Sequence, residues 1–369
     1  NRDEGAPRNG HSIVALAPGN RADRRSPFET MSAQAKRPIS RYVVIAVFLA
    51  SIGLTVAVRW FWWSDHAEHL ESDPDAYRLM ASNLVDLGTL TAGVRPTAFR
   101  PPLYPLILSL SASFDPDGTV GIALLHGLLG VVTTASVVYL AFRYHLRGSA
   151  LLAGVLIALD PILAYQSVRV MTETLATALV AVALVAIERV TATDSAVGEG
   201  EATDRRGGAL ITAATGLLLG LAVLCRPTFL PWLVVLVVYL PMTRATVTFD
   251  RRRFAALMLG VAVALAPWVT RNALVFGRPM VTTTHGGYTL FLANNEDYYR
   301  HLDDAGPRRP WDAAAFAAKH RELLSHESAA DELADNRRAY EEAWRAIREN
   351  PGEFLYATLV RVSRFWDVL

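Results

Sequence analysis

The chain of 369 residues has little of several features that mark common classes of protein. It contains a single cysteine, Cys225, so no disulfide can form within the chain. It shows no internal repeat, whereas transporters are commonly built from repeats. Its formal net charge is +1, so the overall balance gives no indication of a nucleic-acid partner. Hydrophobic residues, in contrast, make up 52% of the chain, against 19% charged.

The hydrophobic residues gather in runs, which is what a bilayer selects. Seven runs can be counted, and most of them approach the roughly 20 residues that a membrane-spanning helix needs. They cover residues 42–63, 119–142, 149–166, 172–190, 209–224, 228–240 and 254–270. The fifth and sixth runs are short and meet at Arg226 and Pro227, which predicts a tight helical hairpin. The sequence therefore predicts an all-α, polytopic membrane protein with a seven-span module over residues 41–270.

The segment before the first run has a different composition. Residues 1–40 are rich in Arg, Pro, Gly, Asn and Ser and show no period, which is typical of disorder. The chain begins with Asn, and Met31 is a candidate start. The first run is too long, and too aromatic at its end, for a cleaved signal peptide. We therefore predict a disordered cytoplasmic tail followed by a retained membrane helix.

Basic residues between the runs predict the orientation, because cytoplasmic loops carry an excess of Lys and Arg. Alternate loops hold Lys36, Arg37 and Arg41; Arg143 and Arg147; Arg205 and Arg206; Arg244 and residues 251–253. We place these loops in the cytoplasm of a multi-pass plasma-membrane protein. The first outer loop, residues 64–118, and everything after residue 270 then lie outside. Residues 60–63 form an aromatic anchor at the outer interface, and Arg59, one turn inside, is expected to extend outward.

The end of the chain is not membrane-like until late. We predict an extracytoplasmic helical segment over residues 271–350, in which residues 311–350 form two amphipathic helices. Pro351 suits the first turn of another helix. Residues 351–369 are therefore expected to be the start of a further helix that continues in a longer protein.

Carboxylates near the predicted outer face are the first candidates for chemistry. Asp73 and Asp75 precede a predicted helix that begins near Tyr77, where they could cap the helix or act as a general base. Glu173 begins the fourth run, where a carboxylate also suits a helix N-terminus. Asp160 lies inside the third run before Pro161, which is compatible with a functional acid or with support of a kink.

Histidines could hold a metal ion or serve the fold. His66 and His69, with the carboxylates around them, have a spacing that could bind a divalent ion, but a solvated polar linker is the preferred interpretation. His126 stands alone on an apolar run, which favours a packed or interhelically bonded histidine.

Three arginines fall on the predicted outer side: Arg100, Arg226 and Arg271. Each lies next to prolines or a tryptophan that would restrain it. The planar guanidinium donates two hydrogen bonds at once and suits phosphate. Contact with lipid headgroups at the interface is the simpler alternative, and this contact by itself would explain the position of Arg271.

An ordered series of motifs resembles a known family. The motifs are Asp73 to Tyr77 with Ala81 and Gly88, Arg100 to Pro105, Met171 to Thr174, Gly216 to Thr228, Pro267 to Asn272, Val275 to Gly277, Gly286 to Tyr288, and Asn294 with Asn295. In this order they resemble the GT-C membrane glycosyltransferases, specifically the bacterial dolichyl-phosphate-mannose-protein mannosyltransferase-like group. The resemblance covers about residues 40–369.

The resemblance implies a GT-C-type helical bundle and a function. That function is inverting transfer of a sugar, hexosyl or pentosyl, from a polyprenyl-phosphate carrier to a hydroxyl of a glycan, lipid or protein acceptor outside the cytoplasm. Asp73 maps to the catalytic acid/base position and is a candidate ligand of a divalent metal ion. Many relatives have Asp-Glu where this chain has Asp73-Pro74, so Asp75 is expected to take the second carboxylate's role.

The remaining predicted site residues complete the set. Glu173 maps to a second acidic position, and Arg100, Arg226 and Arg271 are expected to stabilise the leaving phosphate. Supporting roles are predicted for Tyr77, Tyr104 and Asp160.

Two alternatives remain open: a lipid or sugar transporter or flippase, and a non-catalytic subunit of an envelope-assembly complex. The polar groups gather at one face and no repeat is present, which disfavours a transporter. Presence of Asp73, Glu173 and Arg226 together disfavours an inactive subunit.

Overall fold

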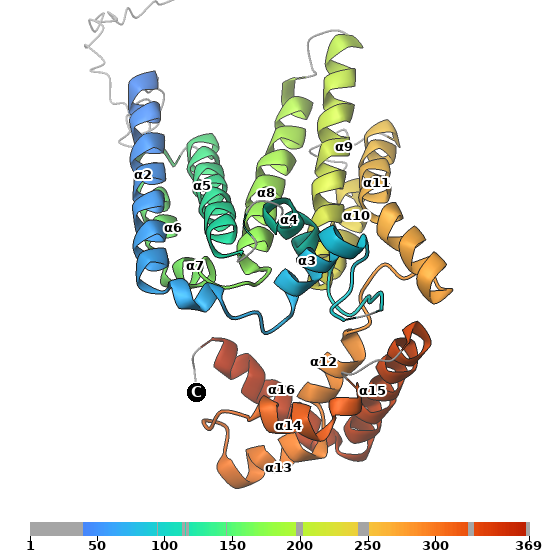
Figure 1. The fold of residues 1–369 in the computed structure, drawn as a ribbon. Helices are drawn as coiled ribbons and strands as arrows, with labels where there is room; N and C mark the ends of the chain where they lie inside the picture. Colours follow the sequence, from blue (N-terminus) through green and yellow to red (C-terminus); the bar gives the residue numbers. More distant parts are fainter. Residues whose placement is uncertain are drawn as a thin grey trace, which may run out of the picture. The chain divides into compact units, whose positions relative to one another are not determined.

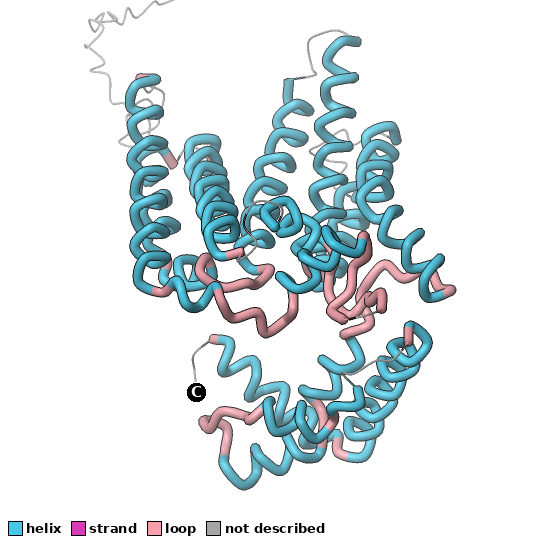
Figure 2. Tube along the Cα trace, in the orientation of Figure 1, coloured by secondary structure: helices cyan, strands magenta, loops and turns pink. Residues whose placement is uncertain are grey.

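The computed structural model describes residues 40–93, 95–112, 115, 118–144, 146–196, 202–242, 251–323 and 328–366. Their regular elements are all helices, and no strand occurs among these residues (Figures 1 and 2). The predicted all-α class is confirmed. The predicted tail, residues 1–40, lies outside the described residues except for Ser40. The chain divides into Asn1–Ile45 and Ala46–Leu369, and the following concerns the second unit.

Four helices are long and apolar enough to cross a membrane: α2 (Arg41–Asp65), α5 (Thr119–Arg143), the Gly207–Cys225 part of α9 (Ala202–Cys225), and α11 (Arg251–Phe276). They coincide with the first, second, fifth and seventh predicted runs. The third run coincides with α6 (Ala150–Leu159) and α7 (Pro161–Gln166), the fourth with α8 (Glu173–Ala196), and the sixth with η4 (Pro227–Phe229) and α10 (Leu230–Met242).

Helices α5, α8, α9 and α11 follow one another in contact (Figure 1). Glycines allow α9 and α11 to approach closely. A Cβ atom at Gly216 would overlap the backbone of Leu257, and one at Gly260 would overlap the backbone of Ala213. Small residues commonly serve this purpose between membrane helices.

The third predicted run is broken where Asp160 meets Pro161. Helix α6 ends at Leu159, and Asp160 Oδ1 accepts the Leu163 backbone N–H at 2.9 Å to cap α7. Pro161 has no N–H to donate and fits the first turn of the new helix. This geometry agrees with the kink-supporting interpretation of Asp160.

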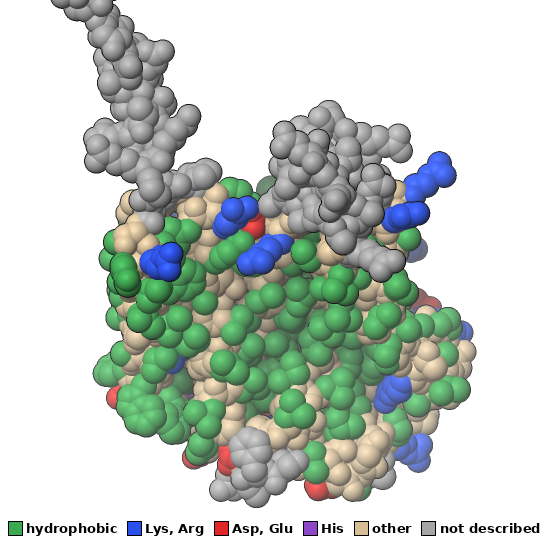
Figure 3. All heavy atoms as spheres, turned by 90° about the horizontal axis from the view of Figure 1, so that it is seen from above, with side chains coloured by type: hydrophobic (Ala, Val, Ile, Leu, Met, Phe, Trp, Pro, Cys, Tyr) green, Lys and Arg blue, Asp and Glu red, His purple; other side chains and the backbone are tan. Residues whose placement is uncertain are grey.

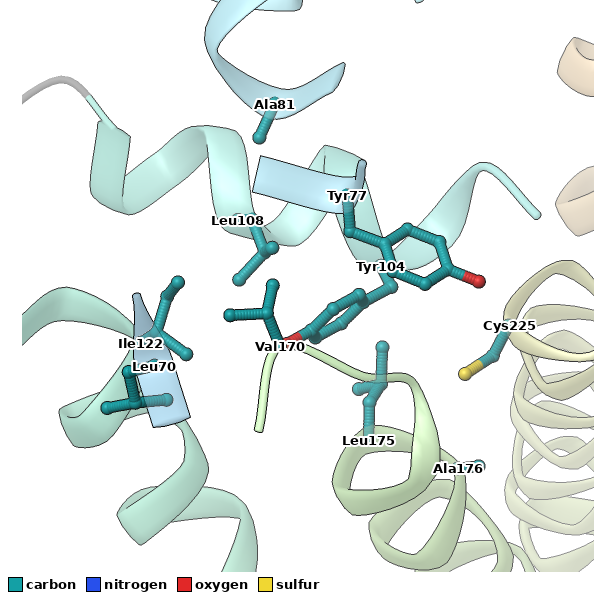
Figure 4. Close-up of a cluster of buried hydrophobic side chains, with 10 residues drawn as sticks. All are labelled: Leu70, Tyr77, Ala81, Tyr104, Leu108, Ile122, Val170, Leu175, Ala176 and Cys225. Carbon is teal, nitrogen blue, oxygen red and sulfur yellow. The ribbon is translucent and has the colours of Figure 1, made fainter. Parts of the chain in front are cut away.

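The first outer loop contributes η1 (Ala67–Leu70), α3 (Tyr77–Leu87) and α4 (Leu103–Ala112), which pack on the ends of the long helices. Figure 4 shows the buried cluster that fixes them, with Tyr77 and Tyr104 between Leu108 and Cys225. The two phenol rings meet edge to face at 5.2 Å. This cluster holds the N-terminal end of α3 next to the end of α9.

His126 of α5 joins this cluster through two hydrogen bonds. Its Nε2 lies 2.9 Å from the Tyr104 hydroxyl, and its Nδ1 lies 2.9 Å from the Ser167 carbonyl oxygen. His126 therefore links three segments, as the interhelical interpretation expected.

A second group of helices follows residue 285, and we call it the outer segment after the side on which it is predicted to lie. It comprises α12 (Gly286–Ala293), α13 (Glu296–Ala305), α14 (Ala313–Lys319), η5 (Arg321–Leu323), α15 (Ala329–Glu349) and α16 (Pro351–Phe365). Helix α12 packs on α15, and α16 packs on α13 and α15. Pro351 begins α16, as predicted.

Charged side chains lie mainly near helix ends. Figure 3 looks down on the end of the molecule that is uppermost in Figure 1 and shows basic side chains around a mainly hydrophobic surface. Arg143 ends α5, and Arg251 and Arg252 begin α11. This is the pattern on which the predicted orientation rests.

Candidate active site

A cavity of about 760 Å³ lies where the first outer loop, the start of α8, the turn between α9 and α10, and the outer segment meet. Its charged lining residues are three arginines and two carboxylates: Asp75, Arg100, Glu173, Arg226 and Arg361. With Tyr77, which also lines it, the cavity brings together five of the residues predicted from the sequence, from positions that lie far apart along the chain.

The first ion pair joins Arg100 Nη2 to Asp75 Oδ1 at 2.6 Å. Asp75 is directed by a sharp turn, because Ala76 has a φ of 59° in the left-handed region. This conformation costs a residue with a Cβ about 1–2 kcal/mol. A strained conformation of this kind is consistent with a turn whose role is to orient Asp75.

The second ion pair joins Arg226 Nη1 to Glu173 Oε1 at 2.8 Å. Arg226 adopts an extended conformation between the end of α9 and Pro227, and Glu173 is the first residue of α8. The second oxygen of Glu173, Oε2, is buried and has no hydrogen-bond partner among the described residues. A buried acceptor of this kind is costly unless a ligand satisfies it.

Asp73 occupies a different position from Asp75. Its Oδ1 accepts the Tyr77 N–H at 2.8 Å, and its Oδ2 accepts the N–H groups of Arg78 and Leu79 at 3.0 and 3.1 Å. Both oxygens therefore cap α3, and Asp73 is not among the residues that line the cavity. The geometry fits the capping interpretation that the sequence left open.

Arg271 does not meet the other two predicted arginines. Its guanidinium lies over the rings of Trp268 and Phe276, at 5.1 and 5.4 Å from their centroids. Its Nη2 donates to the Leu90 carbonyl oxygen at 3.4 Å, within the first outer loop. Arg271 therefore contacts the outer loop and does not line the cavity.

Tyr77 lines the cavity, and Tyr104 lies behind it. Burial raises the pKa of both phenols. Both hydroxyls therefore stay protonated at neutral pH. Tyr104 supports the fold through its hydrogen bond to His126, while Tyr77 lines the cavity.

His285 and Arg361 line the cavity from the outer segment, and sequence reasoning gave neither a role. His285 Nε2 lies 3.5 Å from Arg100 Nη1. Desolvation, and then the charge of Arg100, lower the pKa of His285 to about 4. His285 is therefore neutral at pH 7.

Arg361 is held from within the outer segment. It donates to the Ala293 carbonyl oxygen, and its Nη2 lies 3.4 Å from Asn294 Oδ1. The motifs Gly286–Tyr288 and Asn294 with Asn295 were a signal that this segment contributes to a site. A Cβ at Gly287 would overlap the backbone of Asn336, so the glycine lets α12 approach α15.

The predicted divalent ion has no evident ligand set. Across the part of the chain that the structure describes, no three His, Cys, Asp or Glu side chains could hold a metal together. Asp75 and Glu173 are each paired with an arginine, and Asp73 caps a helix. The His66 ring lies against Trp62, with centroids 4.8 Å apart. Among the described residues, these carboxylates and histidines are not arranged as a ligand set for a metal ion.

The fold and the cavity define a polytopic α-helical membrane protein with paired arginines and carboxylates at the ends of its helices. Residues 99–270 match the family model of dolichyl-phosphate-mannose-protein mannosyltransferase. The match confirms the resemblance found in the sequence and indicates a GT-C-type glycosyltransferase. Neither the curated proteins nor the solved structures compared with the chain match it.

The matched residues contain Arg100, Asp160, Glu173 and Arg226. The cavity also uses residues before and after the match, from the first outer loop and the outer segment.

Proposed function

We propose that the protein transfers a sugar from a polyprenyl-phosphate carrier to an acceptor hydroxyl on the extracytoplasmic face, with inversion at the anomeric carbon. The observation that carries the proposal is the pair of arginine–carboxylate contacts lining one cavity of about 760 Å³. The family match supports the reaction class.

Arg100 and Arg226 are the proposed phosphate ligands. Each arginine carries five N–H donors and uses only some of them on its carboxylate. With His285 neutral, three arginines and two carboxylates give the cavity an excess of one positive charge. A phosphate leaving group would be stabilised there, because preorganised donors stabilise the charge that develops during transfer.

Asp75 is the carboxylate whose position best suits the general base. It lines the cavity, and its Oδ1 is the oxygen that contacts Arg100, whereas both oxygens of Asp73 accept backbone N–H groups. The base takes the proton of the acceptor hydroxyl as its oxygen attacks the anomeric carbon. The bond to the carrier phosphate breaks, and the carrier leaves as its phosphate.

The deciding experiment measures transfer of labelled sugar from a panel of polyprenyl-phosphate sugars, in membranes that contain the full chain. Asp75→Asn should lower activity by about two to four orders of magnitude, the usual contribution of a general base. Asp73→Asn keeps only one of the two oxygens that accept backbone N–H groups of α3, so it should lower the stability of the protein but keep transfer activity, and thermal unfolding should be measured beside activity. Asp86→Asn, on the exposed face of α3, is the matched control.

The results separate three cases. Loss of transfer in Asp73→Asn alone, with normal expression, would return the base to Asp73 as the sequence predicted. Loss in Asp75→Asn alone supports the proposal. If the unmodified chain transfers sugar from no donor in the panel, the proposed transferase activity is rejected, and a transporter or a non-catalytic subunit is favoured.

A further inference from the structure

A second concave site, which we call the side pocket, lies next to the cavity. It has a volume of about 240 Å³ and is formed by the segment between α2 and α3, by α7, and by the turn that leads into α8. Figure 1 shows α7 beside the segment that follows α2. Five of the eight lining residues are polar: Glu68, His69, Ser72, Tyr165 and Arg169.

The side pocket and the cavity adjoin each other at the proposed general base. Met171 lines both of them. Pro74 lines the side pocket, and the next residue, Asp75, lines the cavity. A ligand in the side pocket would therefore lie next to the carboxylate that takes the proton in the proposed reaction.

The polar side chains of the side pocket are accessible and have hydrogen-bonding capacity to spare. Arg169 Nη1 donates to the Tyr165 hydroxyl at 2.6 Å, which occupies one of the five N–H donors of the guanidinium. The Tyr165 hydroxyl accepts this bond and keeps its own hydrogen to donate. Glu68 is 65% exposed, and its Oε1 lies 3.8 Å from His69 Nε2, which is too far for a hydrogen bond. Ser72 is exposed.

These groups fit a neutral ligand that carries several hydroxyls. One guanidinium, one carboxylate and two hydroxyls line the same space, so donors and acceptors are both present without an excess of charge. A hydroxyl of a sugar can donate to one and accept from the other. The rings of Tyr165 and His69, with centroids 5.9 Å apart, add apolar surface beside them.

Other classes of ligand fit less well. An acyl chain would leave the polar groups without partners, which is costly. A peptide bound as an added strand needs an open sheet edge, and the described part of the chain contains no strand. The volume is below the roughly 300–1,000 Å³ of pockets that enclose a whole small molecule. The side pocket therefore suits one unit of a longer glycan.

We propose that the side pocket binds one sugar unit of a neutral glycan acceptor and places a hydroxyl of the adjoining unit at Asp75. This inference rests on the proposed transfer reaction and names the class of its acceptor. The acceptor oxygen bonds to the anomeric carbon, its proton passes to Asp75, and the bond from that carbon to the carrier phosphate breaks. Arg169 and Glu68 hold the acceptor and take no part in these steps.

Saturation-transfer NMR of the full chain in detergent measures acceptor binding without any donor. The probes are neutral trisaccharides of glucose, mannose and galactose, with trigalacturonate and a serine-containing hexapeptide for comparison. At least one neutral trisaccharide should bind, and more tightly than the two comparison ligands. Arg169→Gln and Glu68→Gln should each weaken its binding about tenfold or more, because hydrogen bonds to a charged group are lost. Glu71→Gln, at an exposed position that does not line the side pocket, is the matched control.

A further variant tests the space itself. Ser72 is exposed, so Ser72→Phe should fold normally and fill the side pocket. It should also weaken glycan binding about tenfold or more. In the transfer assay with the trisaccharide that binds, Arg169→Gln should raise the KM for the acceptor about tenfold and leave the KM for the donor unchanged. A purely structural role of Arg169 would instead lower the midpoint of thermal unfolding and leave the KM for the acceptor unchanged.

The outcomes distinguish this inference from the proposed function. Unchanged glycan binding in all three variants, or no binding of any neutral trisaccharide, would overturn the side pocket as an acceptor site even in a chain that transfers sugar. Tighter binding of trigalacturonate or of the hexapeptide would overturn the neutral class and favour an acidic glycan or a protein acceptor. Glycan binding that the variants weaken, in a chain that transfers from no donor, would support the binding site and reject the transfer reaction.

Discussion

Glu332 of α15 is expected to hold the outer segment against the first outer loop. It is 3% exposed, and its carboxylate accepts the Ala98 N–H at 2.9 Å and the hydroxyls of Thr97, at 2.8 Å, and Thr284. Thr97 and Ala98 lie just before Arg100, and Thr284 lies just before His285. One side chain therefore positions two segments that line the cavity.

The expected loss in Glu332→Ala follows from these three bonds. The Thr97 and Thr284 hydroxyls can rotate toward other acceptors, but the Ala98 N–H is fixed and buried. Leaving such a donor unpaired costs about 1–3 kcal/mol, and each bond to a charged group contributes about 1.5–3 kcal/mol. We expect the free energy of unfolding to fall by about 3 kcal/mol. Glu332→Gln keeps an acceptor for Ala98 and should lose about 1 kcal/mol.

Thermal unfolding in nanodiscs, together with hydrogen exchange of the Ala98 amide, measures this effect. Glu332→Ala should lose protection at Ala98 and also lose transfer activity, and Glu332→Gln should recover most of both. Glu341→Ala, at an exposed position on the same helix, is the matched control. Full protection of Ala98 in Glu332→Ala would refute the reasoning.

Three further predictions address orientation, phosphate binding and pH. In a Cys225→Ala background, a cysteine at Asp297 should react with an impermeant reagent outside intact cells and one at Ser149 should not; the reverse would invert the topology. Arg226→Lys keeps the charge but loses the planar fork, so it should raise the donor KM or lower kcat, and unchanged kinetics in Arg226→Ala would make Arg226 only an interfacial anchor. The pKa of His285 is lowered to about 4 in the folded protein from about 6.5. As the pH falls, the unfolded chain therefore takes up a proton on His285 at a higher pH than the folded chain does. Stability should fall as pH drops from about 6.5 to about 4, by roughly 3 kcal/mol, and His285→Gln should remove that slope from the pH dependence of the unfolding midpoint.

The long helices could be predicted because their signal is local. Hydrophobic runs of sufficient length define them regardless of what they pack against. The break at Asp160 and Pro161 and the start of α16 at Pro351 were also readable, because proline restricts the backbone where it occurs.

The details of the site depend on information that no local pattern contains. Asp73 and Asp75 are two positions apart, yet Asp73 caps α3 whereas Asp75 lines the cavity. The left-handed conformation of Ala76 contributes to this difference. Glu332 and Ala98 are separated by 234 positions, and the amphipathic pattern of α15 indicates a buried face without indicating its partner. Arg59 illustrates the same limit: it is only 8% exposed, so the expectation that it extends outward is wrong, and its burial depends on Gly130 of another helix.

In the proposed transfer reaction, the contact between Arg100 and Asp75 predicts an order of substrate binding. While the guanidinium holds Asp75 Oδ1 at 2.6 Å, that oxygen already accepts a hydrogen bond and is not free to face an acceptor hydroxyl. A donor phosphate that takes over Arg100 would free Asp75 to accept the proton from the acceptor hydroxyl. Donor binding would then activate the base, and the donor should bind before the acceptor. Initial-rate kinetics with a dead-end acceptor analogue should therefore show uncompetitive inhibition against the donor. Noncompetitive inhibition would mean that the acceptor binds without the donor, and it would reject this coupling between Arg100 and Asp75.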